Sequence, residues 1–204
     1  MSSTQERRPG TRERLVRSAQ ELLWERGYVG TSPKAILERA EVGQGSMYHH
    51  FAGKSELALA AIRRTADTLA ESAEKCLAGP GTAYERVAAY LQHERQVLRG
   101  CPIGRMTQDR DMVRDPELRQ PLDEMFGWLR GRLAEVLAEG RSRGELSADL
   151  DPADTAATVA AVVQGGYVLA RAADDPAPFD AAVRGALSLL AAHAGTGTTA
   201  PTDH

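Results

Sequence analysis

Apolar side chains recur at helical spacing along almost the whole chain, whereas long alternation of apolar and polar positions is nearly absent. Residues 12–27, for example, place Leu15, Ala19 and Leu22 on one helix face. The same spacing predicts further helices at 33–40, 44–50, 55–77, 82–99, 117–143, 153–173 and 178–193. Residues 100–116 are expected to be irregular or broken helix. The pattern therefore predicts an all-α protein.

The two short helices at 33–40 and 44–50 are separated by a turn at 41–44. This spacing is typical of a helix-turn-helix, in which the second helix enters the major groove of DNA. We therefore expect a DNA-binding domain at 10–54 and a second helical domain at 55–194. The Gly/Thr-rich tail at 195–204 is expected to be disordered.

Charge is distributed unevenly around a net value of −3. Residues 1–54 hold nine basic and six acidic side chains, while residues 55–204 hold sixteen and twenty-two. A positive N-terminal part favours a polyanionic partner, although chance asymmetry accounts for it equally well. The N-terminus lacks the apolar stretch of a secretory signal, and no apolar run approaches the roughly 20 residues of a membrane span. A cytoplasmic protein without membrane contact is expected.

The second short helix carries the candidate chemistry. Gln44, Ser46, Tyr48 and His49 are predicted to be exposed, where each can donate a hydrogen bond to phosphate. Gln44 and His49 can also meet a base edge. Gly45 allows the backbone to approach DNA closely. The alternatives are that Tyr48 belongs to the core and that His49 and His50 form a metal pair, which adjacent positions on a helix disfavour.

Three further side chains are expected to bind the DNA backbone. Lys54 begins the next helix, where its charge and nearby backbone N–H groups can both bind a phosphate. Ser32 and Lys34 lie at the start of the preceding helix, across the groove. Met47 and Phe51, four residues apart, are predicted to face inward and hold the recognition helix on its core.

Residues 12–57 resemble the N-terminal domain of the TetR family of bacterial transcriptional regulators. The resemblance rests on Gly27-Tyr28, Thr31-Ser32, Ile36, Ala40, Val42, the run Gly45-Ser46-Met47-Tyr48-His49-His50-Phe51, and Lys54. It implies DNA contacts at Ser32, Lys34, Gln44, Gly45, Ser46, Tyr48, His49 and Lys54. The chain departs from the family at Glu41, where glycine is usual, and at Gly43, where Ser or Thr often caps the recognition helix.

The resemblance also implies that the C-terminal domain binds a small molecule and forms a homodimer. Ligand candidates are Tyr90, His93, Met106, Met112, Met125, Phe126, Trp128, Gln164 and Tyr167, each of which can equally be an ordinary core residue. The helices at 153–173 and 178–193 are rich in small residues. They are interpreted either as the dimer interface or as central core helices.

Cys101 is interpreted as a structural cysteine, a redox sensor or a catalytic nucleophile. No His/Asp set accompanies it at a recognisable spacing, so no catalytic residue, metal or cofactor is predicted. The leading hypothesis is a repressor, not an enzyme, that an amphipathic small molecule releases from a palindromic operator. The alternatives are a ligand-independent DNA-binding regulator and a small-molecule binding protein.

Overall fold

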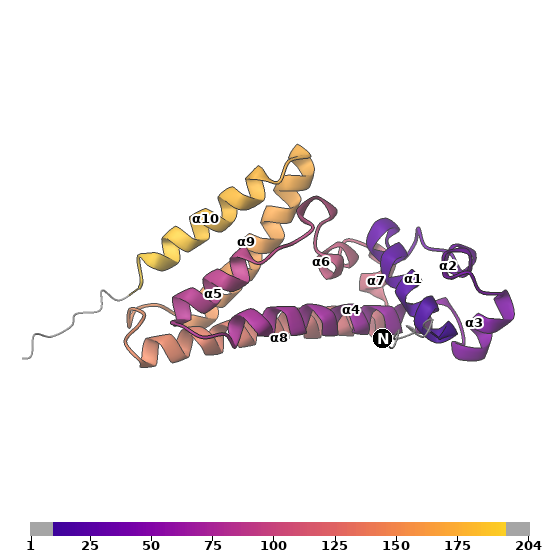
Figure 1. Cartoon of the computed structure of the whole chain (residues 1–204), viewed down its shortest axis with the longest axis horizontal. Coiled ribbons are helices and arrows are strands. Elements are labelled where there is room, and N and C mark those ends of the chain that lie inside the picture. The colour runs from indigo at the N-terminus through magenta and orange to yellow at the C-terminus, as the bar shows by residue number, and fades with distance from the viewer. Residues whose placement is uncertain (1–9, 195–204) are drawn as a thin grey trace, which may run out of the picture. The chain divides into compact units, whose positions relative to one another are not determined.

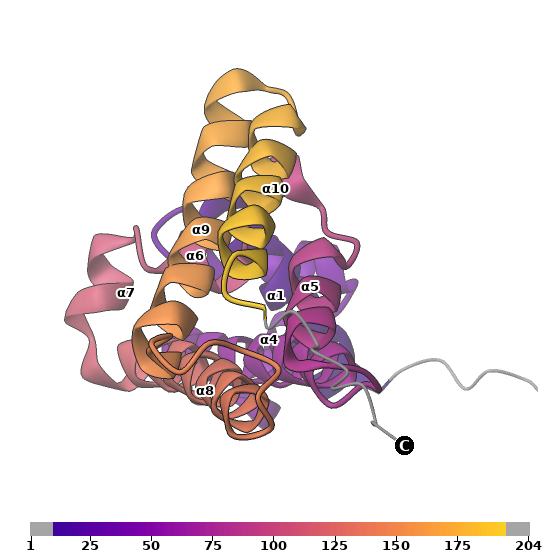
Figure 2. The same ribbon diagram turned by 90° about the vertical axis from the view of Figure 1, so that its left-hand side faces the viewer.

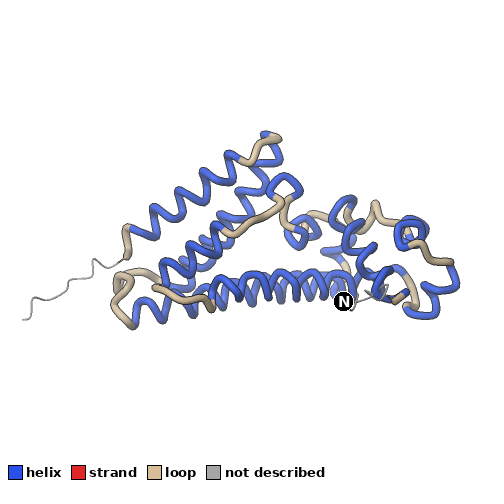
Figure 3. The backbone as a smooth tube through the Cα atoms, viewed as in Figure 1, coloured by secondary structure: helices blue, strands red, loops and turns tan. Residues whose placement is uncertain are grey.

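The computed structural model describes residues 10–194, and every regular element in that range is a helix (Figures 1 and 3). In chain order the helices are α1 (Thr11–Arg26), α2 (Pro33–Ala40), α3 (Gln44–His50), α4 (Lys54–Leu77), α5 (Ala83–Gln92), the 3-10 helix η1 (Val97–Arg99), α6 (Pro102–Met106), α7 (Arg110–Arg114), α8 (Pro116–Ser142), α9 (Pro152–Ala173) and α10 (Ala177–Ala191). The all-α prediction is confirmed. The predicted disordered tail lies outside the described residues.

One stretch differs from the prediction, and a second settles an alternative that the sequence left open. The helix expected at 82–99 ends at Gln92, and only η1 follows within that range. The Arg95 guanidinium donates hydrogen bonds to the carbonyls of Tyr90, Leu91 and His93 at the end of α5. These carbonyls would otherwise accept from backbone N–H groups of a further helical turn. The segment expected to be irregular or broken helix contains two short helices, α6 and α7, in agreement with the second alternative. Pro102 occupies the first position of α6, where proline is favoured.

The chain forms two compact units whose boundaries differ from the predicted division at residue 54. Among the described residues, unit 1 contains 10–67 and 102–123, and unit 2 contains 68–101 and 124–194. The segment 102–123 joins the N-terminal part because it contributes apolar side chains to that core: Met106 and Met112 are fully buried, and α6 packs against α1. The N-terminal unit is therefore discontinuous in sequence.

The core of unit 1 forms where α1, α2 and α3 pack on one another. Its fully buried side chains include Leu15, Leu22, Ile36, Met47 and Leu57. These apolar residues follow the helical spacing from which the helices were predicted. Burial of Met47 and Phe51 confirms that α3 is anchored by one face.

Glu41 ends α2 in the left-handed conformation, with φ 53° and ψ 46°. This conformation costs a residue with a β-carbon roughly 1–2 kcal/mol, and glycine avoids that cost. We therefore expect Glu41→Gly to raise the free energy of unfolding by about 1 kcal/mol in urea denaturation. Asp174, the other left-handed non-glycine residue among those described, gives the matched control. Because aspartate tolerates this conformation better, Asp174→Gly should gain less, and a destabilised Glu41→Gly protein would contradict the argument.

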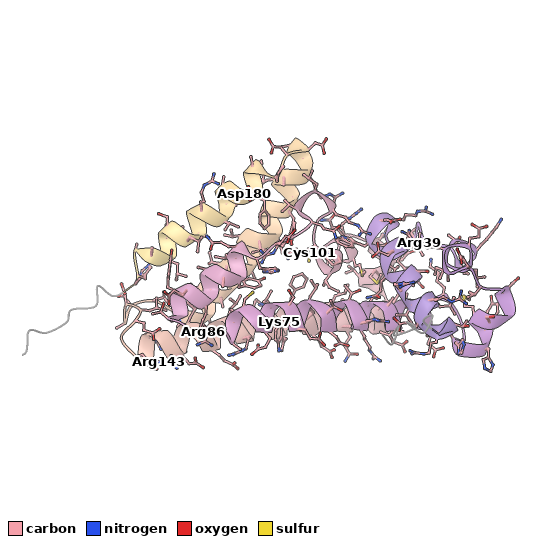
Figure 4. All side chains as sticks on the ribbon, in the orientation of Figure 1. Arg39, Lys75, Arg86, Cys101, Arg143 and Asp180 are labelled. Atoms are coloured by element: carbon pink, nitrogen blue, oxygen red, sulfur yellow. The ribbon has the colours of Figure 1, made fainter. Side chains whose placement is uncertain are left out.

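Unit 2 is organised around α9 and α10, which run side by side in two perpendicular views (Figures 1 and 2). Their close approach depends on Gly166, where an added β-carbon would lie 2.8 Å from the Phe179 ring. At one end of the unit, the buried Arg86 of α5 donates to the Leu77 carbonyl at 2.6 Å and to Glu139 of α8 at 2.8 Å. Figure 4 shows Arg86 and Arg143 at this end.

Candidate nucleic-acid interface

Helix α3 presents a polar face to solvent and an apolar face to the core. Gln44, Gly45, Tyr48 and His49 are exposed, and Ser46 is half-buried. Tyr48 has 56% of its surface exposed, which rules out the interpretation that it is a core residue. An exposed tyrosine combines a flat apolar ring with a hydroxyl donor, so this face can make both apolar and hydrogen-bonding contacts.

The backbone at the start of α3 is open to close approach. A β-carbon built at Gly43 or Gly45 meets no atom within 4 Å. Gly43 is the N-cap residue, and no side chain satisfies the first amides of the helix there. The Ser46 amide donates to the Gly43 carbonyl at 3.0 Å, whereas the amides of Gln44 and Gly45 precede the first helical turn, where such donors favour a negatively charged group.

The start of α2 supplies two more polar groups. The Ser32 hydroxyl oxygen accepts a hydrogen bond from the Ala35 amide at 3.1 Å, which leaves its own hydrogen available for donation. The Lys34 side chain is 86% exposed, and its ammonium lies 3.8 Å from the Glu38 carboxylate. Such an exposed pair is weak, so Lys34 can exchange it for a phosphate at little cost.

Lys54 lies in a different environment from the one expected. Its ammonium donates to the Tyr28 carbonyl at 2.6 Å and lies 4.0 Å from the centre of the Tyr28 ring. Burial lowers the pKa of Lys54, while the charges of Asp109 and Asp111 act to raise it. Lys54 therefore holds the turn between α1 and α2, and a phosphate contact would have to share its ammonium.

Sequence reasoning included Tyr28 in the family resemblance without giving it a role, and it did not single out Asp109. The Asp109 carboxylate accepts hydrogen bonds from the backbone amides of Tyr28 at 2.7 Å and Val29 at 3.0 Å. Asp109 and Tyr28 are 81 residues apart in the chain. No local pattern indicates such a pairing.

In unit 2 the predicted ligand residues are only partly brought together. The Tyr90 and His93 rings lie 5.7 Å apart, and the Tyr167 ring lies 5.0 Å from that of Phe179. The Arg95 guanidinium lies over the Tyr90 ring at 5.1 Å and over the Phe179 ring at 5.8 Å. These side chains form an aromatic cluster around one cation, which we call the Arg95 cluster.

Burial governs the titration of the Arg95 cluster. It raises the pKa of both tyrosine hydroxyls, at Tyr90 and Tyr167, although the nearby Arg95 charge acts in the opposite direction. Burial also lowers the pKa of His93, and Arg95 lowers it further. The tyrosines are therefore neutral hydrogen-bonding groups at neutral pH, and Arg95 is the fixed charge of the cluster.

The other predicted ligand residues are dispersed. Met125 is buried, Phe126 and Gln164 are half-buried and Trp128 is exposed, all in unit 2. Met106 and Met112 are fully buried and belong to the core of unit 1. Among residues 10–194, no group of three or more His, Cys, Asp or Glu side chains is arranged to hold a metal ion.

The exposed side of α9 and α10 forms an open groove with a volume of about 800 Å³. Its walls are mostly small and apolar, and Leu169 and Leu189 are 55% and 72% exposed. The lining residues of this α9–α10 groove are Asp149, Leu150, Asp151, Asp154, Thr155, Thr158, Val159, Val162, Gly165, Gly166, Leu169, Ala182, Gly185, Ala186, Leu189, Leu190, Ala192 and His193. An exposed apolar groove with polar residues at its rim is a candidate interface.

Helix α9 has the length and apolarity of a membrane span, with 22 residues and a mean hydropathy of 1.2. The expectation of no such segment was based on uninterrupted apolar runs, and α9 reaches this value as an average over many alanines. Core helices of soluble proteins have the same length and composition.

Comparison with protein families identifies both parts of the chain. Residues 15–61 match the model for bacterial regulatory proteins of the tetR family. Residues 82–186, about half of the chain, match the model for the tetracyclin repressor-like C-terminal domain.

Individual relatives agree with these matches. The chain is 30% identical to the transcriptional regulator AcuR of Cereibacter sphaeroides over 145 residues, which are 68% of this chain and 66% of AcuR. A TetR transcriptional regulator from Chloroflexus aurantiacus superimposes with a TM-score of 0.80 at 27% identity, covering 90% of this chain and 96% of that one. A cysteine variant of the TetR family regulator CifR, complexed with 26-bp operator DNA, gives a TM-score of 0.74 at 27% identity over 89% and 98% of the two chains.

The family models, the relatives and the exposed polar face of α3 all indicate the same protein class. The chain belongs to the TetR family of DNA-binding transcriptional regulators.

Proposed function

We propose that this regulator is a cytoplasmic homodimeric repressor that binds a palindromic operator with one α3 helix in each half-site. The observation that carries the proposal is the exposure of Gln44, Gly45, Tyr48 and His49 on a helix anchored by buried Met47. Ser32 and Lys34 would bind the phosphate backbone from α2, and Ser46 would contribute from the edge of α3. Lys54 would contribute mainly by holding the α1–α2 turn.

The α9–α10 groove supports pairing with a second copy of the chain. Its exposed Leu169 and Leu189 would lose their contact with water, and its glycines would let the partner's helices approach closely. A two-fold symmetric pair places two α3 helices on one face, as a palindromic site requires.

The Arg95 cluster supports a role for a small-molecule effector in unit 2. Aromatic side chains grouped with a few fixed polar groups are the kind of residues that bind an amphipathic organic compound. Such a compound would release the operator only by binding more tightly to the conformer that does not bind DNA. A ligand-independent regulator would instead bind its operator equally with and without every compound of a broad panel.

The direct test is to select genomic fragments with the purified protein and to titrate the best fragment by fluorescence anisotropy at several salt concentrations. Tight binding to a near-palindrome with a strong salt dependence is expected. Weak binding with no enriched sequence would instead favour a small-molecule binding protein.

Lys34 offers a quantitative prediction within this test. Removing one phosphate contact should lower the slope of log affinity against log salt by about 0.9 in each protomer. We expect Lys34→Gln to do so and to weaken all sequences alike. Lys75→Gln is the matched control, because it removes the same charge from an exposed position in unit 2 (Figure 4). An equal change of slope in both variants would show that Lys34 makes no specific contact.

A further inference from the structure

The Asp109 carboxylate in unit 1 accepts hydrogen bonds from two separate backbone segments. The Oδ2 atom of Asp109 accepts from the amides of Tyr28 and Val29, at 2.7 and 3.0 Å. Its Oδ1 atom accepts from the amides of Asp111 and Met112, at 3.1 and 3.3 Å, and so caps the start of α7. Burial alone would raise the pKa of Asp109, but these four donors outweigh it and lower the pKa. Asp109 is therefore charged at neutral pH.

The turn that Asp109 holds connects α1 to the helix-turn-helix. Gly27 ends α1 with φ 72°, and an added β-carbon there would lie 2.9 Å from the Asp109 carboxylate. The hydroxyl of the buried Thr31 donates to the Gly27 carbonyl at 2.6 Å, and the next residue, Ser32, is the N-cap of α2. The position of this turn therefore sets where α2 starts.

Tyr28 is held from both sides by opposite charges. Its amide donates to Asp109, and its carbonyl accepts from the Lys54 ammonium at 2.6 Å. Lys54 is the first residue of α4, and Asp109 is the N-cap of α7. One peptide residue thus ties together the α1–α2 turn, the start of α4 and the start of α7.

We propose that Asp109 is a positioning residue for DNA binding: its carboxylate locks the α1–α2 turn so that α2 and α3 face DNA together. This inference rests on the proposed operator binding. The segment 102–123 that carries Asp109 leaves unit 2 after Cys101 and returns to it at Glu124. Asp109 therefore belongs to a segment that the chain connects to unit 2 at both of its ends.

The sign of one substitution separates this role from simple electrostatics. Removing an acidic charge from a module that binds a polyanion should by itself leave affinity unchanged or raise it. If Asp109 positions the turn, Asp109→Asn lowers affinity, because an amide nitrogen cannot accept the hydrogen bonds that one carboxylate oxygen now accepts. The salt slope stays unchanged, because no phosphate contact is lost.

The experiment measures full-length wild-type, Asp109→Asn and Asp111→Asn proteins on the selected operator by fluorescence anisotropy at several salt concentrations. Asp111 lies two residues away and its charge, like that of Asp109, acts on Lys54, but the amides of Tyr28 and Val29 donate to Asp109 alone, so Asp111→Asn controls for the lost charge. We expect operator affinity to fall about tenfold for Asp109→Asn with the slope preserved, and to stay equal or rise for Asp111→Asn. Amide exchange at Tyr28 and Val29 should accelerate only in the Asp109 variant.

A second variant keeps the proposal testable if Asp109→Asn folds poorly. Asp109→Ser retains a good N-cap for α7, but its single short hydroxyl cannot also reach the turn. It should therefore fold and still bind the operator weakly. Wild-type affinity and unchanged exchange in the Asp109 variants would overturn the inference alone, whereas a wild-type protein that binds no operator would overturn the proposed function and this inference with it.

Discussion

Gly165→Arg should convert the proposed homodimer into a monomer and reduce operator affinity at least about 100-fold, because two linked recognition helices bind far more tightly than one. Gly165 is exposed in the α9–α10 groove, and a β-carbon there meets no atom of its own protomer within 4 Å. The variant protomer should therefore fold, and it gains helix propensity. In the proposed dimer, however, the long cationic side chain would be forced into a mostly apolar interface, where burial of a charge is costly.

The control for this prediction is Gly131→Arg on α8. Gly131 is also an exposed helical glycine with open space at its β-carbon, and it does not line the groove. Light scattering after size exclusion gives the mass of each variant, and anisotropy gives its operator affinity. A Gly165→Arg protein that stays dimeric while Gly131→Arg behaves as wild type would place the interface elsewhere.

Gly45→Leu should reduce operator affinity about 100-fold, equivalent to roughly 2.7 kcal/mol, without lowering the stability of the free protein. In the free protein a β-carbon at Gly45 meets nothing, so the glycine serves no packing purpose within the chain. Glycine in a helix costs roughly 0.5–1 kcal/mol relative to alanine, so substitution should stabilise α3 slightly. The loss would come only where the side chain meets the DNA backbone.

Two measurements check that substitution at Gly45 weakens operator binding without lowering the stability of the protein. Urea denaturation should show Gly45→Ala and Gly45→Leu at or above wild-type stability, while anisotropy shows affinity falling with side-chain size. Gly127→Leu, at an exposed and open helical position of α8, should leave both quantities near wild type. Full operator affinity in Gly45→Leu would mean that α3 does not approach DNA with this face.

The elements that the sequence predicts well are those in which local signals agree. The bounds of α2 and α3 match the prediction, because Ser32, Pro33 and the buried apolar positions all indicate the same helices. The end of α5 was missed because a side chain, Arg95, stops it and no glycine or proline follows at once. For residues 100–116 the sequence predicted only irregular structure or broken helix, and the bounds of α6 and α7 did not follow from it, because Pro102 can end one helix or begin the next.

In the candidate site, too, local signals predict some features and miss others. Exposure of Gln44, Tyr48 and His49 follows from helical periodicity, which assigns each residue to a face. The environment of Lys54 does not follow, because it depends on Tyr28 and, through it, on Asp109. Periodicity carries no information about partners so distant in the chain. The Arg95 cluster was missed in part for the same reason, since Phe179 and Arg95 come from separate segments.

The discontinuity of unit 1 has a consequence for how the protein is made and how it can be re-engineered. A ribosome releases residues 1–67 well before Asp109, so the nascent helix-turn-helix lacks the buried methionines and the carboxylate that complete it. Maturation of this domain must wait until residue 123 has emerged. A chimera that joins only residues 1–67 to a foreign sensory domain would lack the same buried methionines and the Asp109 carboxylate. A chimera that also carries residues 102–123 would transfer the complete N-terminal unit.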